Sequence, residues 1–337
     1  MDFPPRPGSS RPRRESPQGE SPFSFPPEPE PEAETGESAP VPAPGTEAEP
    51  EPPARSGRRR FRRRAANKSG GGRRSETIAR VLWAIPWIVF AVFIVAVGGP
   101  VFAVAAVGLA WAVQIELFRM TARSRPFEAA AFAGTAGMVA AAYFGSSFQI
   151  LLALVATVPV MLVFALARPS LKNVTWSLAM TMLALVWIGL PFAHAVLLRE
   201  LPLHGGALLV DVLVATFFTD TFAYLGGRLF GQRPLAPQVS PNKTIEGLLI
   251  GIVGGVLGFW LAGLYQDWLS GPQALLFGFC IAILAPLGDL FESAIKRDLD
   301  VKDTGRMLGP HGGLLDRLDA VLFTIVAGYY LALAIVY

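Results

Sequence analysis

The sequence predicts an all-α polytopic integral membrane protein with about nine transmembrane helices and a disordered N-terminal tail. Hydrophobic residues make up 52% of the 337 residues and charged residues only 16%, a balance typical of membrane proteins. The first 80 residues hold 15 of the 29 Lys and Arg residues and 12 of the 26 Asp and Glu residues. Beyond them, the chain consists mainly of apolar runs long enough to cross a bilayer.

The tail, residues 1–75, has two parts that differ in composition. The first 54 residues carry sixteen of the 29 prolines, and such a Pro- and Glu-rich segment cannot bury enough apolar surface to fold. Residues 55–74 (RSGRRRFRRRAANKSGGGRR) then form a polybasic block directly before the first apolar run. A nucleic-acid site is the alternative interpretation. We favour a cytoplasmic anchor to anionic lipid, with no nucleic-acid partner, because a membrane span follows at once.

Apolar runs of roughly 20 residues, the length that a helix needs to cross a bilayer, follow one another from residue 80. We assign residues 76–200 to N-terminal transmembrane helices and residues 201–337 to a C-terminal transmembrane region, with a Gly98-Gly99-Pro100 break between the first two spans. The expected spans are 80–97, 99–118, 127–144, 148–167, 174–198, 207–226, 245–266, 272–291 and 318–337.

The distribution of basic residues predicts which loops face the cytoplasm. With the N-terminus inside, nine spans place thirteen Lys and Arg residues in inner loops and one, Arg199, outside. Because cytoplasmic loops carry an excess of Lys and Arg, the pattern predicts an N-in, C-out topology. It also places the charged segment 293–319 in the cytoplasm, and we expect the protein in the plasma membrane.

Two groups of polar residues flank the sixth and seventh expected spans. Asp220 lies near the inner end of the sixth span, with Tyr224 one helical turn later on the same face. In the following loop, Ser240, Lys243 and Thr244 offer hydrogen bonds and positive charge to an anion, and Ser240 or Thr244 is suited to cap the next helix. The alternative for this loop is a plain helix cap with a lysine that reaches the membrane surface.

A third group lies at the inner ends of the last two spans. Asp289, Glu292 and Lys296 are spaced to share one face of a continuing helix, and Asp316 and Asp319 are three residues apart where the last helix starts. Two carboxylate pairs suit Mg²⁺, which takes oxygen ligands and leaves positions for water and phosphate. The alternative is a salt-bridged loop whose charges only neutralise one another.

The segment 293–319 resembles the signature of the phosphatidate cytidylyltransferase family, also called CDP-diacylglycerol synthases. The matching elements are Ser293, Lys296-Arg297, Lys302-Asp303, His311-Gly312-Gly313 and Asp316-Arg317-x-Asp319. The strings DTFAYLGGR (220–228) and SPNKTIEG (240–247) follow the family's order. The resemblance thus covers the chain from about residue 207 onwards, whereas residues 80–200 match only as generic spans and residues 1–75 have no counterpart.

The resemblance implies transfer of CMP from CTP to phosphatidic acid, with Mg²⁺ required and CDP-diacylglycerol and pyrophosphate as products. It also implies a homodimer, and it allows a second cation such as K⁺. We expect Asp289 and Asp316 to be the main metal ligands, with Glu292 and Asp319 as further ligands or as groups that orient metal-bound water.

The remaining roles follow from charge and hydrogen-bonding capacity. Lys296 and His311 join the four metal-binding carboxylates as catalytic candidates, His311 as a hydrogen-bond donor to phosphate or to its own turn rather than as a proton carrier. Glu116 is expected to pair with Arg119. The candidates for substrate binding are Asp220, Ser240, Lys243, Thr244, Arg297, Lys302, Asp303, Gly312, Gly313 and Arg317.

Two other functions fit parts of this pattern. A lipid kinase that uses CTP would need the same anion-binding groups, and a membrane transporter would also carry acids within its spans, such as Asp220. The single cysteine, Cys280, excludes an intrachain disulfide and a cysteine-cluster metal site.

Overall fold

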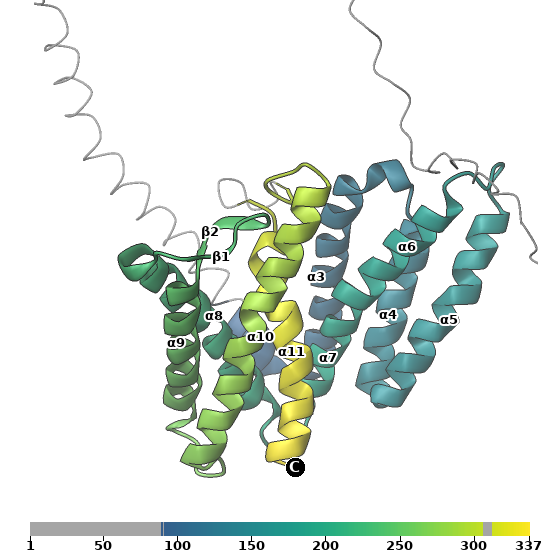
Figure 1. Ribbon diagram of the computed structural model, residues 1–337. Helices are drawn as coiled ribbons and strands as arrows, with labels where there is room; N and C mark the ends of the chain where they lie inside the picture. Colours follow the sequence, from purple (N-terminus) through teal and green to yellow (C-terminus); the bar gives the residue numbers. More distant parts are fainter. Residues whose placement is uncertain (1–88, 90, 306–311) are drawn as a thin grey trace, which may run out of the picture. The chain divides into compact units, whose positions relative to one another are not determined.

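A computed structural model of the chain describes residues 89, 91–305 and 312–337. The described elements are helices apart from one short hairpin (Figure 1). The longer helices are α3 (Gly99–Met120), α4 (Glu128–Phe144), α5 (Ser147–Leu166), α6 (Val174–Ala184), α7 (Leu190–Arg199), α8 (Gly205–Phe230), α9 (Ile245–Gly263), α10 (Gly271–Asp298) and α11 (Leu315–Ile335). The short elements are η1 (Ala122–Ser124), η2 (Leu185–Gly189), β1 (Pro234–Ala236) and β2 (Ser240–Thr244). The predicted tail lies outside the described residues.

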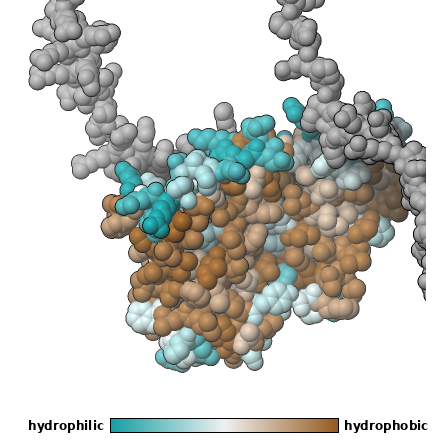
Figure 2. Space-filling model, in the orientation of Figure 1, coloured by the Kyte–Doolittle hydropathy of each residue, from teal (hydrophilic) through white to brown (hydrophobic). Residues whose placement is uncertain are grey.

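Seven helical segments in the described part of the chain are long and apolar enough to cross a membrane, with α6, η2 and α7 forming one of them. Hydrophobic residues form a broad band along the helices, and hydrophilic residues gather at the end that carries β1, β2 and the connection from α10 to α11 (Figures 1 and 2). The prediction of an all-α multi-pass membrane protein is confirmed. The number of nine stays a prediction, because most of residues 80–97 lie outside the described residues and α4 has only 17 residues.

Side-chain caps fix the start of three helices. Ser146 and Ser270 form capping boxes with the residues three positions later, at the starts of α5 and α10. At the start of α9, Thr244 Oγ1 accepts a hydrogen bond from Gly247 N at 3.1 Å. Thr244 therefore fills the cap position for which the sequence offered both Ser240 and Thr244.

The Gly98-Gly99 break is a turn between two helical segments. The two glycines have φ values of 63° and 56°, in the left-handed region that glycine enters without steric cost. Arg199 Nε donates to Val95 O at 2.5 Å, and Glu200 Oε1 accepts from Gly99 N at 2.9 Å. The one basic residue expected on the outer side thus satisfies a carbonyl at the end of helical residues 91–97.

Helices α8, α9 and α10 pack closely because glycines on α9 face their neighbours. A Cβ added to Gly251 would lie 2.7 Å from Ala223 Cβ, and one added to Gly255 would lie 2.0 Å from Thr219 Oγ1 and 2.7 Å from Ala282 Cβ. Small residues of this kind let membrane helices approach through van der Waals contact. Helix α7 packs against α4 on one side and α11 on the other (Figure 1).

We expect Gly255→Ala to lower the thermal midpoint of the detergent-solubilised protein by roughly 3–10 °C, because overpacking a tight interface costs about 1–3 kcal/mol. Gly108→Ala is the matched control, since a Cβ added there meets no atom within 4 Å. Its midpoint should stay unchanged or rise slightly, because alanine favours helix over glycine. Equal midpoints for the two variants would show that the contact of α9 with α8 and α10 is not tight.

Candidate active site

The β1–β2 hairpin links α8 to α9 and contacts the end of α10. Lys243 Nζ, from β2, lies 2.5 Å from Asp289 Oδ2, and Arg297 Nε donates to Val239 O in the hairpin turn at 3.2 Å. The sequence predicted only a loop here. Strands of three and five residues with no alternation of apolar and polar side chains give no pattern by which to predict them.

Three carboxylates meet where α10 and α11 adjoin. Asp289, Glu292 and Asp319, which we call the acid cluster, each have one oxygen within 4.8 Å of the others. Glu292 is 1% exposed and Asp319 is 7% exposed, whereas the Asp289 side chain is about one-third exposed. Because α10 continues to Asp298, Asp289 and Glu292 share one helix face, as their spacing predicted.

A glycine allows α10 and α11 to come this close. A Cβ added to Gly288 would lie 2.3 Å from the backbone oxygen of Asp319 and 2.9 Å from Ala320 Cα. Since these are backbone atoms, a larger residue would force the two helices apart. Gly288 therefore brings Asp319 beside Glu292.

Lys296 bridges the two helices next to the acid cluster. Its Nζ lies 2.9 Å from Glu292 Oε2 and 2.8 Å from Asp316 Oδ1. The Lys296 and Asp316 side chains are each 12% exposed. Burial makes such a pair costly unless its polar atoms are satisfied, and Lys296 offers an ammonium to both carboxylates.

The other oxygen of Asp316 holds the connection between α10 and α11. Asp316 Oδ2 accepts from Gly313 N at 2.8 Å, from Thr304 N at 3.0 Å and from Thr304 Oγ1 at 2.9 Å. Asp316 was predicted to be a metal ligand like the three acids of the cluster. In the structure, however, its two oxygens contact Lys296 and this connection. It does not belong to the group of three carboxylates.

The site has an excess of negative charge, which favours a bound cation. Asp220, on α8, is exposed and interacts electrostatically with Asp289, Asp319 and Lys243. Together with the acid cluster and Asp316, it makes five carboxylates against the two ammonium groups of Lys243 and Lys296. Three formal negative charges remain within this set of seven side chains.

The chemistry of these donors fits Mg²⁺. Carboxylate oxygens are the protein ligands that this ion takes, and the acid cluster supplies three of them within 4.8 Å. Glu292 Oε1 is buried and has no hydrogen-bond partner among the described residues. Because an unsatisfied buried carboxylate oxygen is costly, a cation at this position would remove the cost.

The remaining predicted residues belong to segments that contribute to this centre. Ser240 begins β2, Lys302 and Asp303 are exposed beyond the end of α10, and Arg317 is exposed in the first turn of α11. Gly312 has a φ of 83°, as a tight turn requires. His311 lies outside the described residues.

The contact that Glu116 makes from α3 was not predicted from the sequence. This residue is 1% exposed, and its Oε2 accepts a hydrogen bond from Leu315 N at 2.9 Å. The expected partner Arg119 is instead exposed. The contact joins residues 199 positions apart, so no local spacing could reveal it, and the only available signal was an acid inside an apolar run.

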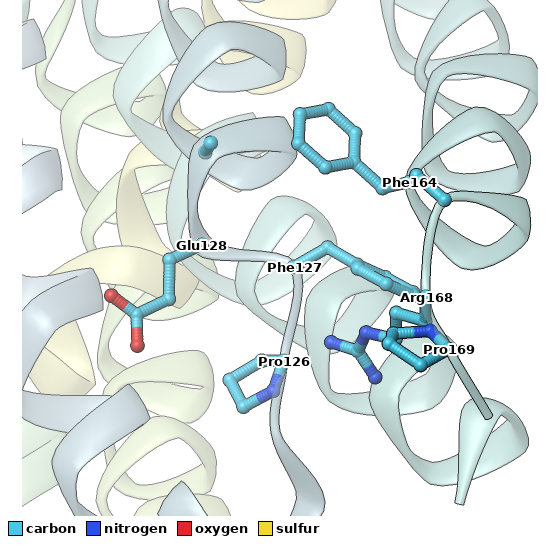
Figure 3. Close-up of a pocket in the computed structure, with 8 residues that line it drawn as sticks. Pro126, Phe127, Glu128, Phe164, Arg168 and Pro169 are labelled. Atoms are coloured by element: carbon cyan, nitrogen blue, oxygen red, sulfur yellow. The ribbon is translucent and has the colours of Figure 1, made fainter. Parts of the chain in front are cut away.

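The structure also contains a pocket of about 380 Å³ between the start of α4 and the end of α5 (Figure 3). Phe127, Phe164 and Arg168 line it, and the Arg168 guanidinium lies 4.0 Å from the centre of the Phe127 ring. Arg168 Nη1 also donates to Ser177 Oγ at 2.8 Å. None of the predicted site residues lines this pocket, so it is not the candidate active site.

The chain is similar in sequence to several known proteins. The chain is 42% identical over 165 residues to the uncharacterized protein YnbB of Escherichia coli, covering 48% of this chain and 53% of that protein. It is 39% identical over 153 residues to the phosphatidate cytidylyltransferase of Bacillus subtilis, covering 44% and 56%. It is 46% identical over 122 residues to the enzyme of that name from Helicobacter pylori strain 26695, covering 35% and 44%.

The chain spans about half the length of the curated relatives that it matches. The match to the family is longer than the match to any of these relatives. Residues 78–335 match the Cytidylyltransferase family, from the first expected span to the end of α11. The chain therefore belongs to the cytidylyltransferase family.

Proposed function

We propose that the protein transfers CMP from CTP to phosphatidic acid, which forms CDP-diacylglycerol and pyrophosphate. The observation that carries the proposal is the acid cluster between Lys243 and Lys296, at one end of apolar helices. Such a site joins cation-binding carboxylates to phosphate-binding ammonium groups. Family membership and the names of the Bacillus and Helicobacter relatives support the same reaction.

The two substrates require a site at a membrane boundary. Phosphatidic acid stays in the bilayer through its acyl chains, whereas the charged triphosphate of CTP stays in water. Hydrophilic residues gather at the end of the helices that carries the hairpin and the α10–α11 connection (Figure 2). The excess of basic residues in the inner loops supports placing this end in the cytoplasm, with the protein in the plasma membrane as a homodimer.

The chemistry is an in-line displacement at the α-phosphorus of CTP. A phosphatidate oxygen forms the new bond to this phosphorus, and the bond to the bridging oxygen breaks, so pyrophosphate leaves with the electron pair. A phosphate monoester is already ionised near neutral pH, so this nucleophile needs no general base. His311 is then a hydrogen-bond donor to phosphate or to its own turn.

The chain's own residues bind and orient the phosphates. Lys243, Lys296, Arg297 and Arg317 supply positive charge, and Ser240, Thr244 and the Gly312 amide supply hydrogen-bond donors. Gly313, whose amide donates to Asp316, shapes the same turn. Lys302 and Asp303 extend the binding surface beyond α10, and Asp220 orients Lys243. Mg²⁺ held by the acid cluster, with Asp316 positioned beside it through Lys296, would supply charge that offsets the charge of the attacked phosphate and of pyrophosphate; a second cation such as K⁺ would add to this effect.

Position-specific labelling of CTP tests the proposal on purified protein with phosphatidic acid and Mg²⁺. Label on the α-phosphate should enter the lipid, and label on the γ-phosphate should appear in pyrophosphate. A lipid kinase would instead place the γ-label in the lipid and release CDP. A transporter would form no labelled lipid and would carry a solute into sealed vesicles, and either result would show that the proposal is wrong.

A further inference from the structure

Glu116 connects the N-terminal helices to the proposed active site. Its carboxylate projects from α3 and is buried, with 1% of the residue exposed. Oε2 accepts a hydrogen bond from Leu315 N, the first residue of α11, at 2.9 Å. A carboxylate is stabilised at this point, because the first amides of a helix lack partners within the helix and carry its positive dipole end.

Both described ends of the α10–α11 connection lie against this carboxylate. A Cβ added to Gly305 would lie 2.9 Å from Glu116 Oε1, and one added to Gly313 would lie 2.7 Å from Glu116 Oε2. The Gly313 position is also tight toward Thr304, whose Oγ1 would lie only 1.9 Å from an added Cβ. The two glycines therefore let the backbone reach Glu116 from both sides.

The same connection residues bind Asp316. Thr304 Oγ1 lies 2.9 Å from Asp316 Oδ2 and 3.4 Å from Glu116 Oε2. A hydroxyl has one proton, so Thr304 donates mainly to Asp316, and the firm bond of Glu116 is the one to Leu315 N. Glu116 thus anchors the residue directly before Asp316, and Asp316 in turn contacts Lys296 at 2.8 Å.

We propose that Glu116 is a positioning residue of the active site. By accepting from Leu315 N and packing against the two glycines, it anchors the α10–α11 connection so that Asp316 stays beside Lys296 and the acid cluster. The inference rests on the proposed function for its catalytic consequence. It makes α3 a necessary part of the site, although the sequence motifs covered only the chain from about residue 207; the family match, over residues 78–335, includes α3.

Two conservative variants separate the effect of the side chain's length from the effect of its charge. Glu116→Gln keeps the length of the side chain and an acceptor oxygen but removes the charge, whereas Glu116→Asp keeps the charge but withdraws the oxygens by one methylene. If Glu116 acts by holding Leu315 N, Glu116→Gln should retain most of the turnover number for CMP transfer. Glu116→Asp and Glu116→Ala should lower it about 10- to 100-fold, as loss of groups that orient ligands does, with the KM for CTP little changed.

Hydrogen exchange of the backbone gives a readout that does not need activity. Amides of residues 304, 305, 313 and 315 should exchange faster in Glu116→Asp and Glu116→Ala than in the wild type, with Glu116→Gln close to the wild type. Glu128→Gln and Glu128→Ala are the matched controls, because this exposed carboxylate begins α4. They should change neither exchange nor turnover.

The outcomes distinguish this inference from the proposed function. Exchange that is unchanged in all three Glu116 variants, or a Glu116→Asp variant more active than Glu116→Gln, would overturn the positioning role. A wild type that forms no CDP-lipid would overturn the proposed function, and the exchange data would still report whether Glu116 holds the connection. If Glu116→Ala does not fold, the order of the Gln and Asp variants decides the question.

Discussion

Asp289→Asn should lower the rate of CDP-diacylglycerol formation at least about 100-fold while the protein stays folded. Asparagine keeps the size of the side chain but removes the negative charge that faces Lys243 at 2.5 Å and completes the acid cluster. A bound metal contributes several kcal/mol of charge stabilisation in the transition state, and each 1.36 kcal/mol is a factor of ten in rate. The measurement is the turnover number with labelled CTP, beside the thermal midpoint.

Asp298→Asn is the matched control for this variant. Asp298 ends the same helix and is exposed, so the same substitution there should leave the rate within about twofold of the wild type. A magnesium titration adds a second test, since loss of a ligand should raise the Mg²⁺ concentration needed for half-maximal rate. If Asp289→Asn kept more than a tenth of the activity with an unchanged Mg²⁺ requirement, the acid cluster would not be the metal site.

Local spacing predicted those parts of the site that lie on one helix. Asp289, Glu292 and Lys296 share a face of α10 because the helix continues through the charged segment to Asp298, and helical periodicity is sufficient to predict such a face. The cap at Thr244 follows from equally local chemistry. The positions of the apolar spans were also predictable from local sequence, because they depend only on the length and composition of each run.

Contacts between distant segments were not predictable in this way. The approach of Asp319 to Glu292 depends on Gly288, where α10 and α11 touch, but glycine is frequent in membrane helices and its presence does not indicate which helix lies against it. The bond from Leu315 N to Glu116 spans 199 positions. The sequence alone therefore suggested a site made of Asp220, the loop from Ser240 and the segment from Asp289 onwards, whereas the structure also brings α3 into contact with it.

Lys296→Met should destabilise the protein and also inactivate it. The lysine bridges Glu292, which is 1% exposed, and Asp316, which is 12% exposed in its side chain. Methionine fills similar space without charge, so the variant leaves two carboxylates facing each other without their shared cation. Removing one partner of a buried ion pair costs about 3–5 kcal/mol, which corresponds to a fall in thermal midpoint of at least roughly 6 °C.

Stability and chemistry can then be separated with a second substitution. Adding Glu292→Gln to Lys296→Met removes one of the two unpaired negative charges, so the double variant should regain part of the lost thermal midpoint. The stability changes caused by substitutions at contacting residues are not additive. Its CMP transfer should stay low, since the acid cluster has lost a carboxylate and the phosphates have lost an ammonium. Lys172→Met, at an exposed loop position, is the control for the substitution itself. If its midpoint fell as far as that of Lys296→Met, the loss of stability would not come from the bridge. If the double variant regained activity together with stability, the bridge would be structural only and Lys296 would not contact the substrate.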